Sequence, residues 1–257
     1  SLSRLMTKLM IKNVHYLSEE PWEPLFEDEK PLMVLSSHGP IMGFAPVLFS
    51  TIKRVTEVGY GDKLFAGVAH PFLLKIPGMR NFVYGDMPIE ATRPKMRDYL
   101  RWFEQGLDGI MLFPEGEFSM YGDGLDIQPF RTNRFVELAL QVDCNIMLLV
   151  CKGYEIWQKN VPFRSQLAKD LLYKGARMLL KNDAINREQL EKSDFLSFPW
   201  MMQRIPDFYL KSTIYRPELS FGDLSQDKET REAQLWKEAH QIRTQMQGML
   251  SSLTVLQ

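Results

Sequence analysis

The stretch that decides the fold reads PLMVLSSHGPIMGFAPVLF, from Pro31 to Phe49. Its apolar run Leu32–Leu35 predicts a buried strand, which the polar Ser-Ser-His-Gly-Pro segment ends. The proline of that segment suits the first position of a helix, where the N–H it lacks would be unpaired anyway. We expect Ser37 or His38 at the cap and the helix body over Ile41–Ile52. The stretch therefore predicts a histidine at a strand-to-helix corner, beside free N–H groups and a positive dipole end.

A second stretch, IMLFPEGEFSMYG, runs from Ile110 to Gly122 and has a similar organisation. An apolar strand over Ile110–Phe113 leads into the turn Pro114-Glu115-Gly116, which presents a carboxylate at a strand end. In α/β sheets the cleft lies beside the carboxyl ends of the strands, so we expect the two corners to share one cleft.

The remaining chain alternates short apolar strands with amphipathic helices. This alternation predicts an α/β fold, a largely parallel central sheet covered by helices, with a helical N-terminal segment and a C-terminal elaboration. The further strands are expected at Arg54–Val58, Leu64–Val68, Asn81–Tyr84, Asn145–Cys151 and Tyr209–Ile214. The further helices are expected at His70–Ile76, Glu90–Gln105, Phe130–Val142, Gln166–Lys181 and Ser225–Leu253.

The first thirty residues are interpreted as an N-terminal helix and linker, ahead of one α/β domain over residues 31–257. Leucine and methionine alternate with Arg4, Lys8 and Lys12 at helical spacing, which predicts a basic amphipathic helix over Leu2–Tyr16. This helix packs on the domain or, alternatively, docks on a membrane with its apolar face in the interface. Glu19–Lys30, with its prolines and acids, is expected to be a linker.

Composition excludes several classes of protein. The 257 residues are 45% hydrophobic and 25% charged, which is enough for a substantial core. A net charge of -1 gives no support for nucleic-acid binding. Cys144 and Cys151 are interpreted as buried, reduced thiols, and the sequence has neither metal-ligand spacing nor a dinucleotide fingerprint. With no long apolar run, we expect a cytoplasmic protein without metal or cofactor, in peripheral contact with a membrane at most.

The two corner motifs together resemble a known family. His38-Gly-Pro-Ile-Met-Gly43 and Phe113-Pro-Glu-Gly-Glu-Phe-Ser119 are similar to motifs I and III of the glycerolipid acyltransferase superfamily, which includes the 1-acylglycerol-3-phosphate acyltransferases. The family forms are His-x-x-x-x-Asp and Phe-Pro-Glu-Gly-Thr-Arg-Ser, and the order of elements matches over Pro31–Leu253. The resemblance implies a glycerol-3-phosphate acyltransferase-like fold. It also implies transfer of a fatty acyl group from acyl-CoA or acyl carrier protein, as co-substrate, to a hydroxyl.

The resemblance also assigns roles to residues. His38, whose side chain titrates in the physiological range, would act as the general base on the acceptor hydroxyl. Glu115 would shape the site and its acceptor contacts, and turn N–H groups near Gly39 and Gly116 would receive the oxyanion. The residues expected to contact substrate are Gly39, Gly43, Arg80, Phe113, Pro114, Gly116, Glu117, Phe118, Ser119 and Arg131.

Motif I departs from the family at Gly43, which stands where most members have the aspartate that orients the histidine. A backbone carbonyl would orient His38 instead, or a carboxylate from Glu115, Glu117 or Asp86. Ser37-His38-Gly39 is similar to the His-Gly signature of diacylglycerol acyltransferase relatives, which lack that aspartate. The alternatives are a catalytically degenerate member that binds lipids or acyl chains, and a peripheral scaffold that docks through residues 2–16.

Motif III departs at Glu117 and Phe118, which replace threonine and arginine. The family's arginine there is associated with the acceptor phosphate, which a guanidinium suits. The motif II arginine is also missing, because Tyr84-Gly85-Asp86 carries an acid near its place. We therefore expect an acceptor other than a glycerol phosphate, such as a neutral lipid or isoprenoid alcohol. Phe118 would line an apolar acceptor site or take part in ordinary packing. The cations that could replace the missing arginines are Lys75, Arg80, Arg131 and Arg134.

Overall fold

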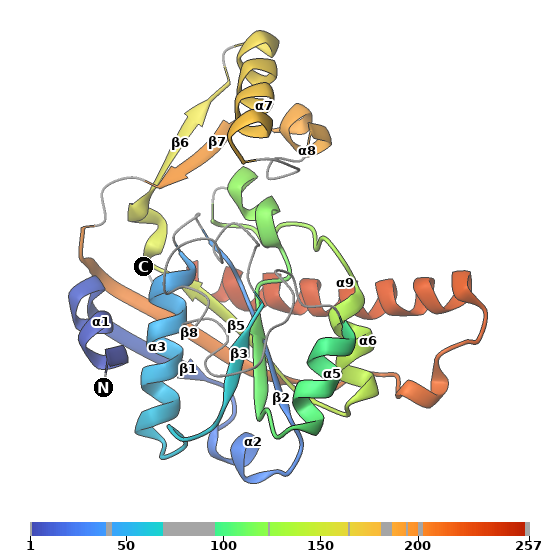
Figure 1. Ribbon diagram of the computed structural model, residues 1–257. Helices are drawn as coiled ribbons and strands as arrows, with labels where there is room; N and C mark the ends of the chain where they lie inside the picture. The colour runs from blue at the N-terminus through green and yellow to red at the C-terminus, as the bar shows by residue number, and fades with distance from the viewer. Residues whose placement is uncertain are drawn as a thin grey trace.

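The computed structural model describes residues 2–39, 43–68, 96–122, 124–163, 165–180, 187–193, 195–199 and 203–254. A six-stranded sheet in the order β1-β8-β5-β2-β4-β3 forms its centre (Figure 1). Among the strands that the structure describes in this sheet, only the β5–β8 pair is antiparallel, and the other pairs are parallel. The expected α/β class is therefore confirmed. The strands are β1 (Ile11–Ser18), β2 (Leu32–Ser36), β3 (Phe65–Gly67), β4 (Gly109–Leu112), β5 (Asn145–Lys152) and β8 (Ile205–Tyr215).

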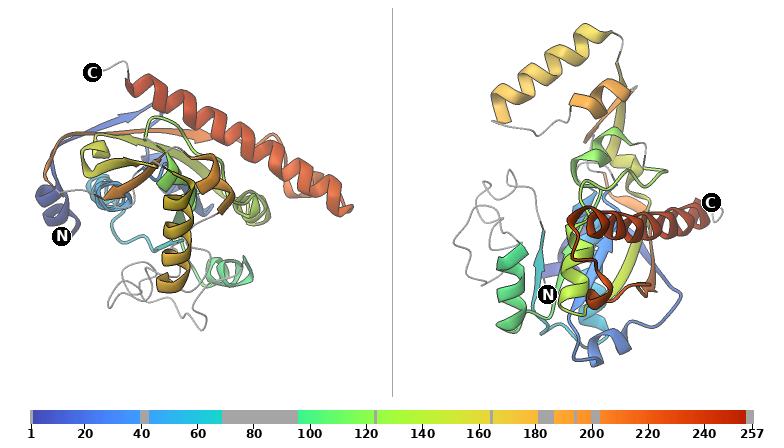
Figure 2. Two further views of the ribbon diagram at one scale, coloured as in Figure 1. Left: turned by 90° about the horizontal axis from the view of Figure 1, so that it is seen from above. Right: turned by 90° about the vertical axis from the view of Figure 1, so that its right-hand side faces the viewer.

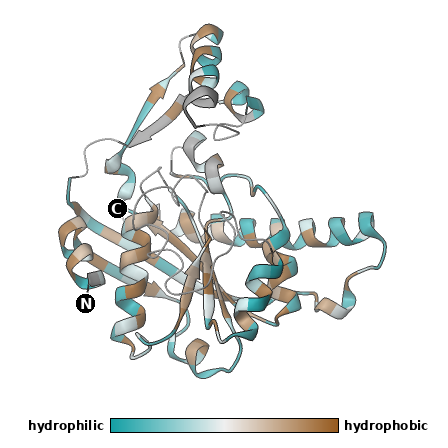
Figure 3. Cartoon of the chain, in the orientation of Figure 1, coloured by the Kyte–Doolittle hydropathy of each residue, from teal (hydrophilic) through white to brown (hydrophobic). Residues whose placement is uncertain are grey.

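Helices cover both faces of this sheet. In β2, Met33 and Leu35 pack with α5, α6 and α9, whereas Leu32 and Val34 face the side that holds α2 and α3. Successive residues of a strand point to opposite faces, so a strand covered on both sides must be apolar throughout. Figure 3 accordingly shows the central strands largely in brown, and Figure 2 shows α9 and α3 on opposite sides of the sheet. The helices are α2 (Glu23–Glu27), α3 (Phe44–Glu57), α5 (Met96–Glu104), α6 (Arg134–Gln141) and α9 (Lys228–Thr254).

A smaller lobe projects from the carboxyl-end side of the sheet (Figure 1). Its strands β6 (Gln158–Pro162) and β7 (Phe195–Pro199) pair antiparallel beside α7 (Gln166–Leu180) and α8 (Arg187–Lys192). Leu190 and Leu196 of the lobe form a buried cluster with Tyr121, and Phe118 packs against that cluster. Tyr121 and Phe118 belong to the 3₁₀ helix η2 (Gly116–Tyr121), which follows β4. The lobe therefore supports the segment that carries the second corner motif.

The N-terminal segment differs from its prediction. Helix α1 spans Leu2–Met10, and the chain then continues as strand β1. A helix over Leu2–Tyr16 is therefore wrong beyond Met10, because β1 pairs with β8 from Ile11↔Ile205 to Ser18↔Ser212. The segment expected to be a linker contains α2, and Trp22, Leu25 and Phe26 within it are buried in the core.

Several element boundaries also differ. Gly43, rather than Ser37 or His38, is the N-cap of α3, and the expected strand Arg54–Val58 is wrong because α3 continues to Glu57. Helix α6 begins at Arg134, after the N-cap Asn133. The helix expected at 70–76 and the strand expected at 81–84 lie outside the described residues.

Other predicted features agree with the structure. Strands β3, β4 and β5 and helices α7 and α9 lie where the sequence predicts them, and α5 does so over its described part. Cys144 and Cys151 are both buried free thiols. No helix in the described ranges is long and apolar enough to cross a membrane.

Candidate active site

The register of β2 and β4 brings the two corner motifs together. These strands are parallel neighbours with Leu35 opposite Leu112, so three further residues along each strand lead to His38 and Glu115. The main-chain N–H of His38 donates to Oε1 of Glu115 at 2.9 Å, although the two residues are 77 positions apart. The structure thus joins the two motifs at one edge of the sheet.

Glu115 uses both carboxylate oxygens for main-chain N–H groups. Its Oε2 accepts from the N–H of Gln128 at 2.7 Å, and the side chain is only 3% exposed. Arg243 of α9 fixes the same loop, because its guanidinium donates to the carbonyl of Ile127 at 2.7 Å. Burial raises the pKa of Glu115 to about 7, against the opposing effect of the two N–H groups and Arg243. Glu115 is therefore placed to position the loops around His38.

The His38 ring lies between two aromatic side chains and one hydroxyl. Nδ1 is 3.0 Å from Oγ of Ser119 and 3.3 Å from the carbonyl oxygen of Gly39. Phe113 meets the ring edge-on, with centroids 5.1 Å apart, and Phe44 lies further away at 6.3 Å. Burial lowers the pKa of His38, and the Gly39 carbonyl opposes this effect. The imidazole is thus kept neutral, as a proton acceptor must be.

A carboxylate oriented toward the ring was one expectation for this site. Within the described residues, the contact from Glu115 goes to the main chain of His38 and not to its ring. The Gly39 carbonyl, which was the other expectation, does lie near Nδ1. Asp86 and the side chain of Glu117 lie outside what the structure describes.

Tyr154, which the sequence did not single out, closes the site from a third strand. It begins the 3₁₀ helix η3 (Tyr154–Trp157) after β5, is 1% exposed, and packs against Gly39. Gly39 has φ of 61°, and a Cβ there would overlap the Tyr154 ring. Only glycine combines this backbone conformation with so close an approach. Gly153, with φ of 111°, ends β5 and turns the chain toward the site.

The remaining predicted site residues take different places. The Gly116 N–H donates to the Phe113 carbonyl at 3.0 Å. That turn N–H groups near Gly39 and Gly116 receive the oxyanion stays a prediction. The carbonyl of Pro114 accepts the main-chain N–H of Arg131 at 3.2 Å, and the Arg131 side chain is exposed. Gly43 caps α3.

Phe118 and Arg80 were also expected to contact substrate. Phe118 takes part in packing against the lobe, which was the plainer of its two interpretations. Arg80 lies outside the described residues.

A small pocket lies beside the motif residues. Its lining contains the acids Glu115 and Asp126 but, within the part of the chain that the structure describes, neither lysine nor arginine. The other residues that line it are Ser37, Gly39, Ser119, Gly122, Gly124, Ile127, Gln128, Tyr154 and Leu250. The described residues contain no group of His, Cys, Asp and Glu side chains arranged to hold a metal ion.

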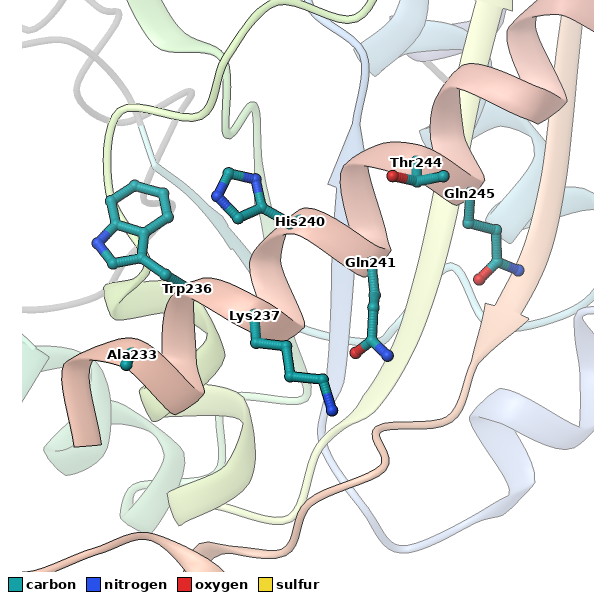
Figure 4. Close-up of a pocket in the computed structure, with 7 residues that line it drawn as sticks. All are labelled: Ala233, Trp236, Lys237, His240, Gln241, Thr244 and Gln245. Atoms are coloured by element: carbon teal, nitrogen blue, oxygen red, sulfur yellow. The ribbon is translucent and has the colours of Figure 1, made fainter. Parts of the chain in front are cut away.

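A larger, shallow hollow runs along α9 (Figure 4). All of its lining residues come from this one helix, and none comes from the loops around His38. His240 lies in it and is exposed, and its ring is tilted beside Trp236 with centroids 5.8 Å apart. His15, at the sheet edge, contacts Asp207 at 2.8 Å. Neither histidine has the surroundings of His38.

The sequence matches no family model and no curated protein. Among solved structures, the chain is similar to the 1-acyl-sn-glycerophosphate (LPA) acyltransferase PlsC from Thermotoga maritima. The similarity has a TM-score of 0.43 at 12% identity, and covers 94% of this chain and 78% of that chain. A likeness this distant identifies no function.

Proposed function

We propose that this protein is an O-acyltransferase of the glycerolipid acyltransferase type. In the proposed reaction the acyl group moves from a thioester, acyl-CoA or acyl carrier protein, to an alcohol. His38 removes the hydroxyl proton as the oxygen attacks the thioester carbonyl, and the thiol leaves. One observation carries the proposal: the His38 N–H donates to Glu115 at 2.9 Å, which unites the two motifs whose pairing resembles that family.

The environment of His38 suits this role. A general base must be neutral before it accepts a proton, and burial lowers the pKa of His38 below its ordinary value. The carboxylate of Glu115 and the ring of Tyr154 hold the surrounding loops, so the base would have little freedom to move. Positioning of this kind lowers the entropic part of the barrier.

For the acceptor, we propose a neutral lipid or a long-chain alcohol. The described residues that line the pocket include the acids Glu115 and Asp126 and neither lysine nor arginine, although Arg243 of α9 acts electrostatically on Glu115. We expect this lining to disfavour a phosphate. The Arg131 side chain is exposed, although its main chain bonds to Pro114 beside the site. A hydroxyl without a phosphate avoids this repulsion.

The proposal predicts thiol release from long-chain acyl-CoA or acyl carrier protein that depends on an added acceptor. Diacylglycerol and a long-chain alcohol should stimulate release more than lysophosphatidate does. The assay follows free thiol and confirms the acylated product by mass spectrometry. Equal or greater stimulation by lysophosphatidate would contradict the acceptor assignment, and no release with any donor or acceptor would contradict the activity.

A second function is favoured by Gly43, which replaces the aspartate of motif I. In this alternative the protein binds a lipid or acyl chain in the same cleft without turnover. Native mass spectrometry of the purified protein distinguishes the two. A retained fatty ligand together with no thiol release would identify the binding protein.

We also propose that α1 docks on a lipid surface. This helix buries Ser3 and Thr7, which are 6% and 3% exposed, and exposes Leu5 and Leu9, which are 56% and 63% exposed. A helix on a soluble domain ordinarily buries its leucines. Here the leucines point outward and Lys8 is exposed between them, which suits an interface of acyl chains and anionic headgroups.

Docking predicts that the double variant Leu5→Ser, Leu9→Ser binds anionic liposomes at least about tenfold more weakly, because each buried leucine contributes about 2 kcal/mol. Liposome flotation measures this binding. Leu167→Ser, Leu171→Ser is the matched control, because these α7 leucines are similarly exposed, at 67% and 62%. Unchanged flotation of the α1 variant would contradict docking through α1.

A further inference from the structure

Ser119 has a single hydroxyl proton and two neighbours that compete for it. Its Oγ donates to the carbonyl oxygen of Gly116 at 2.9 Å, and the same Oγ is 3.0 Å from Nδ1 of His38. The Gly116 carbonyl oxygen can only accept, so when this bond is made the proton of Ser119 lies in it. The hydroxyl oxygen then offers a lone pair to His38, and the hydrogen between Ser119 and His38 must come from Nδ1.

The Gly39 carbonyl leads to the same assignment. It lies 3.3 Å from Nδ1 of His38 and can only accept a hydrogen bond. Two acceptors therefore face Nδ1, and a proton on that nitrogen can be shared between them. In a neutral imidazole the other nitrogen, Nε2, then keeps its lone pair.

We propose that Ser119 is the positioning residue that replaces the motif aspartate. It holds His38 as the Nδ1–H tautomer, which leaves Nε2 free to take the hydroxyl proton of the alcohol substrate. This inference rests on the proposed function. It adds the Ser119 hydroxyl to the Gly39 carbonyl as an orienting group, whereas the sequence predicts only a backbone carbonyl or a carboxylate for that role. Residue 43, where the aspartate would stand, is the N-cap of α3.

The surroundings of Ser119 fit a positioning role. The residue is 4% exposed and sits on η2, which the lobe supports through the packing of Phe118 and Tyr121. Its bond to Gly116 fixes the side-chain torsion, so the lone pair keeps its direction toward His38. As Nε2 takes the proton in the reaction, the ring becomes an imidazolium, and the same contact then stabilises a charged donor.

The test uses Ser119→Ala, with Ser119→Thr as the variant that keeps the hydroxyl. Ser50→Ala is the matched control, because Ser50 is also buried but its Oγ has no hydrogen-bond partner among the described residues. Nitrogen-15 NMR of histidine-labelled protein reports which ring nitrogen carries the proton, and His38→Gln assigns the His38 signals among the four histidines. Circular dichroism checks that each variant is folded.

Wild type and Ser50→Ala are expected to show a protonated Nδ1 and an unprotonated Nε2 at neutral pH. Ser119→Ala should move both signals toward an average of the tautomers and lower kcat about 10- to 100-fold, the range for a hydrogen bond to a charged group. Ser119→Thr should restore the wild-type signals.

Two outcomes would overturn the proposal: a wild-type His38 protonated at Nε2, or a folded Ser119→Ala variant whose tautomer and kcat are unchanged. The NMR result does not need turnover. If the wild type releases no thiol, the proposed acyltransferase activity is wrong. The Ser119–His38 assignment is then decided by the tautomer that NMR reports.

Discussion

Replacing His38 by alanine is expected to lower acceptor-dependent thiol release about 10²- to 10⁴-fold, the usual contribution of a general base. The variant should fold, because the ring is only partly buried and the N–H that binds Glu115 belongs to the main chain. Steady-state kinetics with acyl-CoA and the preferred acceptor measures the loss. The substitution should lower kcat more than it changes KM, since the His38 side chain takes part in proton transfer and not in binding the acyl donor.

The matched control is His240→Ala, which removes an exposed histidine of α9. Its rate should stay within about a factor of two of wild type, in line with the small effects of most surface substitutions. A His38→Ala enzyme with wild-type turnover would exclude His38 as the base.

The pH profile gives an independent check on His38. Only the neutral imidazole can accept a proton, and burial lowers its pKa from the ordinary value near 6.5. The activity of wild type should therefore be retained below pH 6.5 and fall only as the pH drops through the lowered pKa. A limb with a midpoint above that ordinary value would contradict the assignment.

Replacing Glu115 by alanine is expected to be the most damaging change to stability at the site. It leaves the N–H groups of His38 and Gln128 without an acceptor, and each lost partner in a buried setting costs about 1–3 kcal/mol. Urea unfolding measures the loss. Turnover should fall as well, because the loop that carries His38 loses its connection to the loop after β4.

Glu115→Gln removes the titrating group and one of its two acceptor oxygens, and its effect on the pH dependence of stability has a definite sign. The pKa is about 7 in the folded protein and near 4.5 when unfolded, so the folded state binds more protons between these values. The free energy of unfolding from this group therefore falls as pH rises from about 4.5 to 7, by about 3 kcal/mol in all. Wild type should lose about this much more stability than Glu115→Gln between pH 4.5 and 8. Parallel pH dependence of the two proteins would contradict the raised pKa.

Much of the site can be predicted from the sequence because it depends on two local patterns. Each apolar strand, β2 and β4, ends in a polar turn, and parallel strands deliver their carboxyl ends to the same edge. That is sufficient to bring His38 and Glu115 into contact at one edge of the sheet. The contacts of Glu115 are harder to predict from the sequence, since its partner Gln128 lies in a loop without a periodic pattern.

The parts that could not be predicted depend on distant contacts. Residues 11–16 continue the helical pattern of the preceding turn closely enough to be interpreted as helix, yet they belong to a strand that pairs with β8. Nothing in the sequence distinguishes Tyr154 from other residues that follow an apolar strand. It packs at the site because Gly39 has no side chain to exclude its ring. For Ser119 the motif match marks the residue, but only the bond to Gly116 defines which partner receives its proton.

The pairing of β1 with β8 has a consequence for synthesis on the ribosome. Ile11 pairs with Ile205 in a parallel ladder, so one edge of the sheet joins segments 194 residues apart. During translation β1 emerges before β8 and stays unpaired until the residues up to β8 have left the exit tunnel. An unpaired strand is a template for association with other chains, so a nascent chain would depend on α1 and α2 to shield β1, or on a chaperone to hold it.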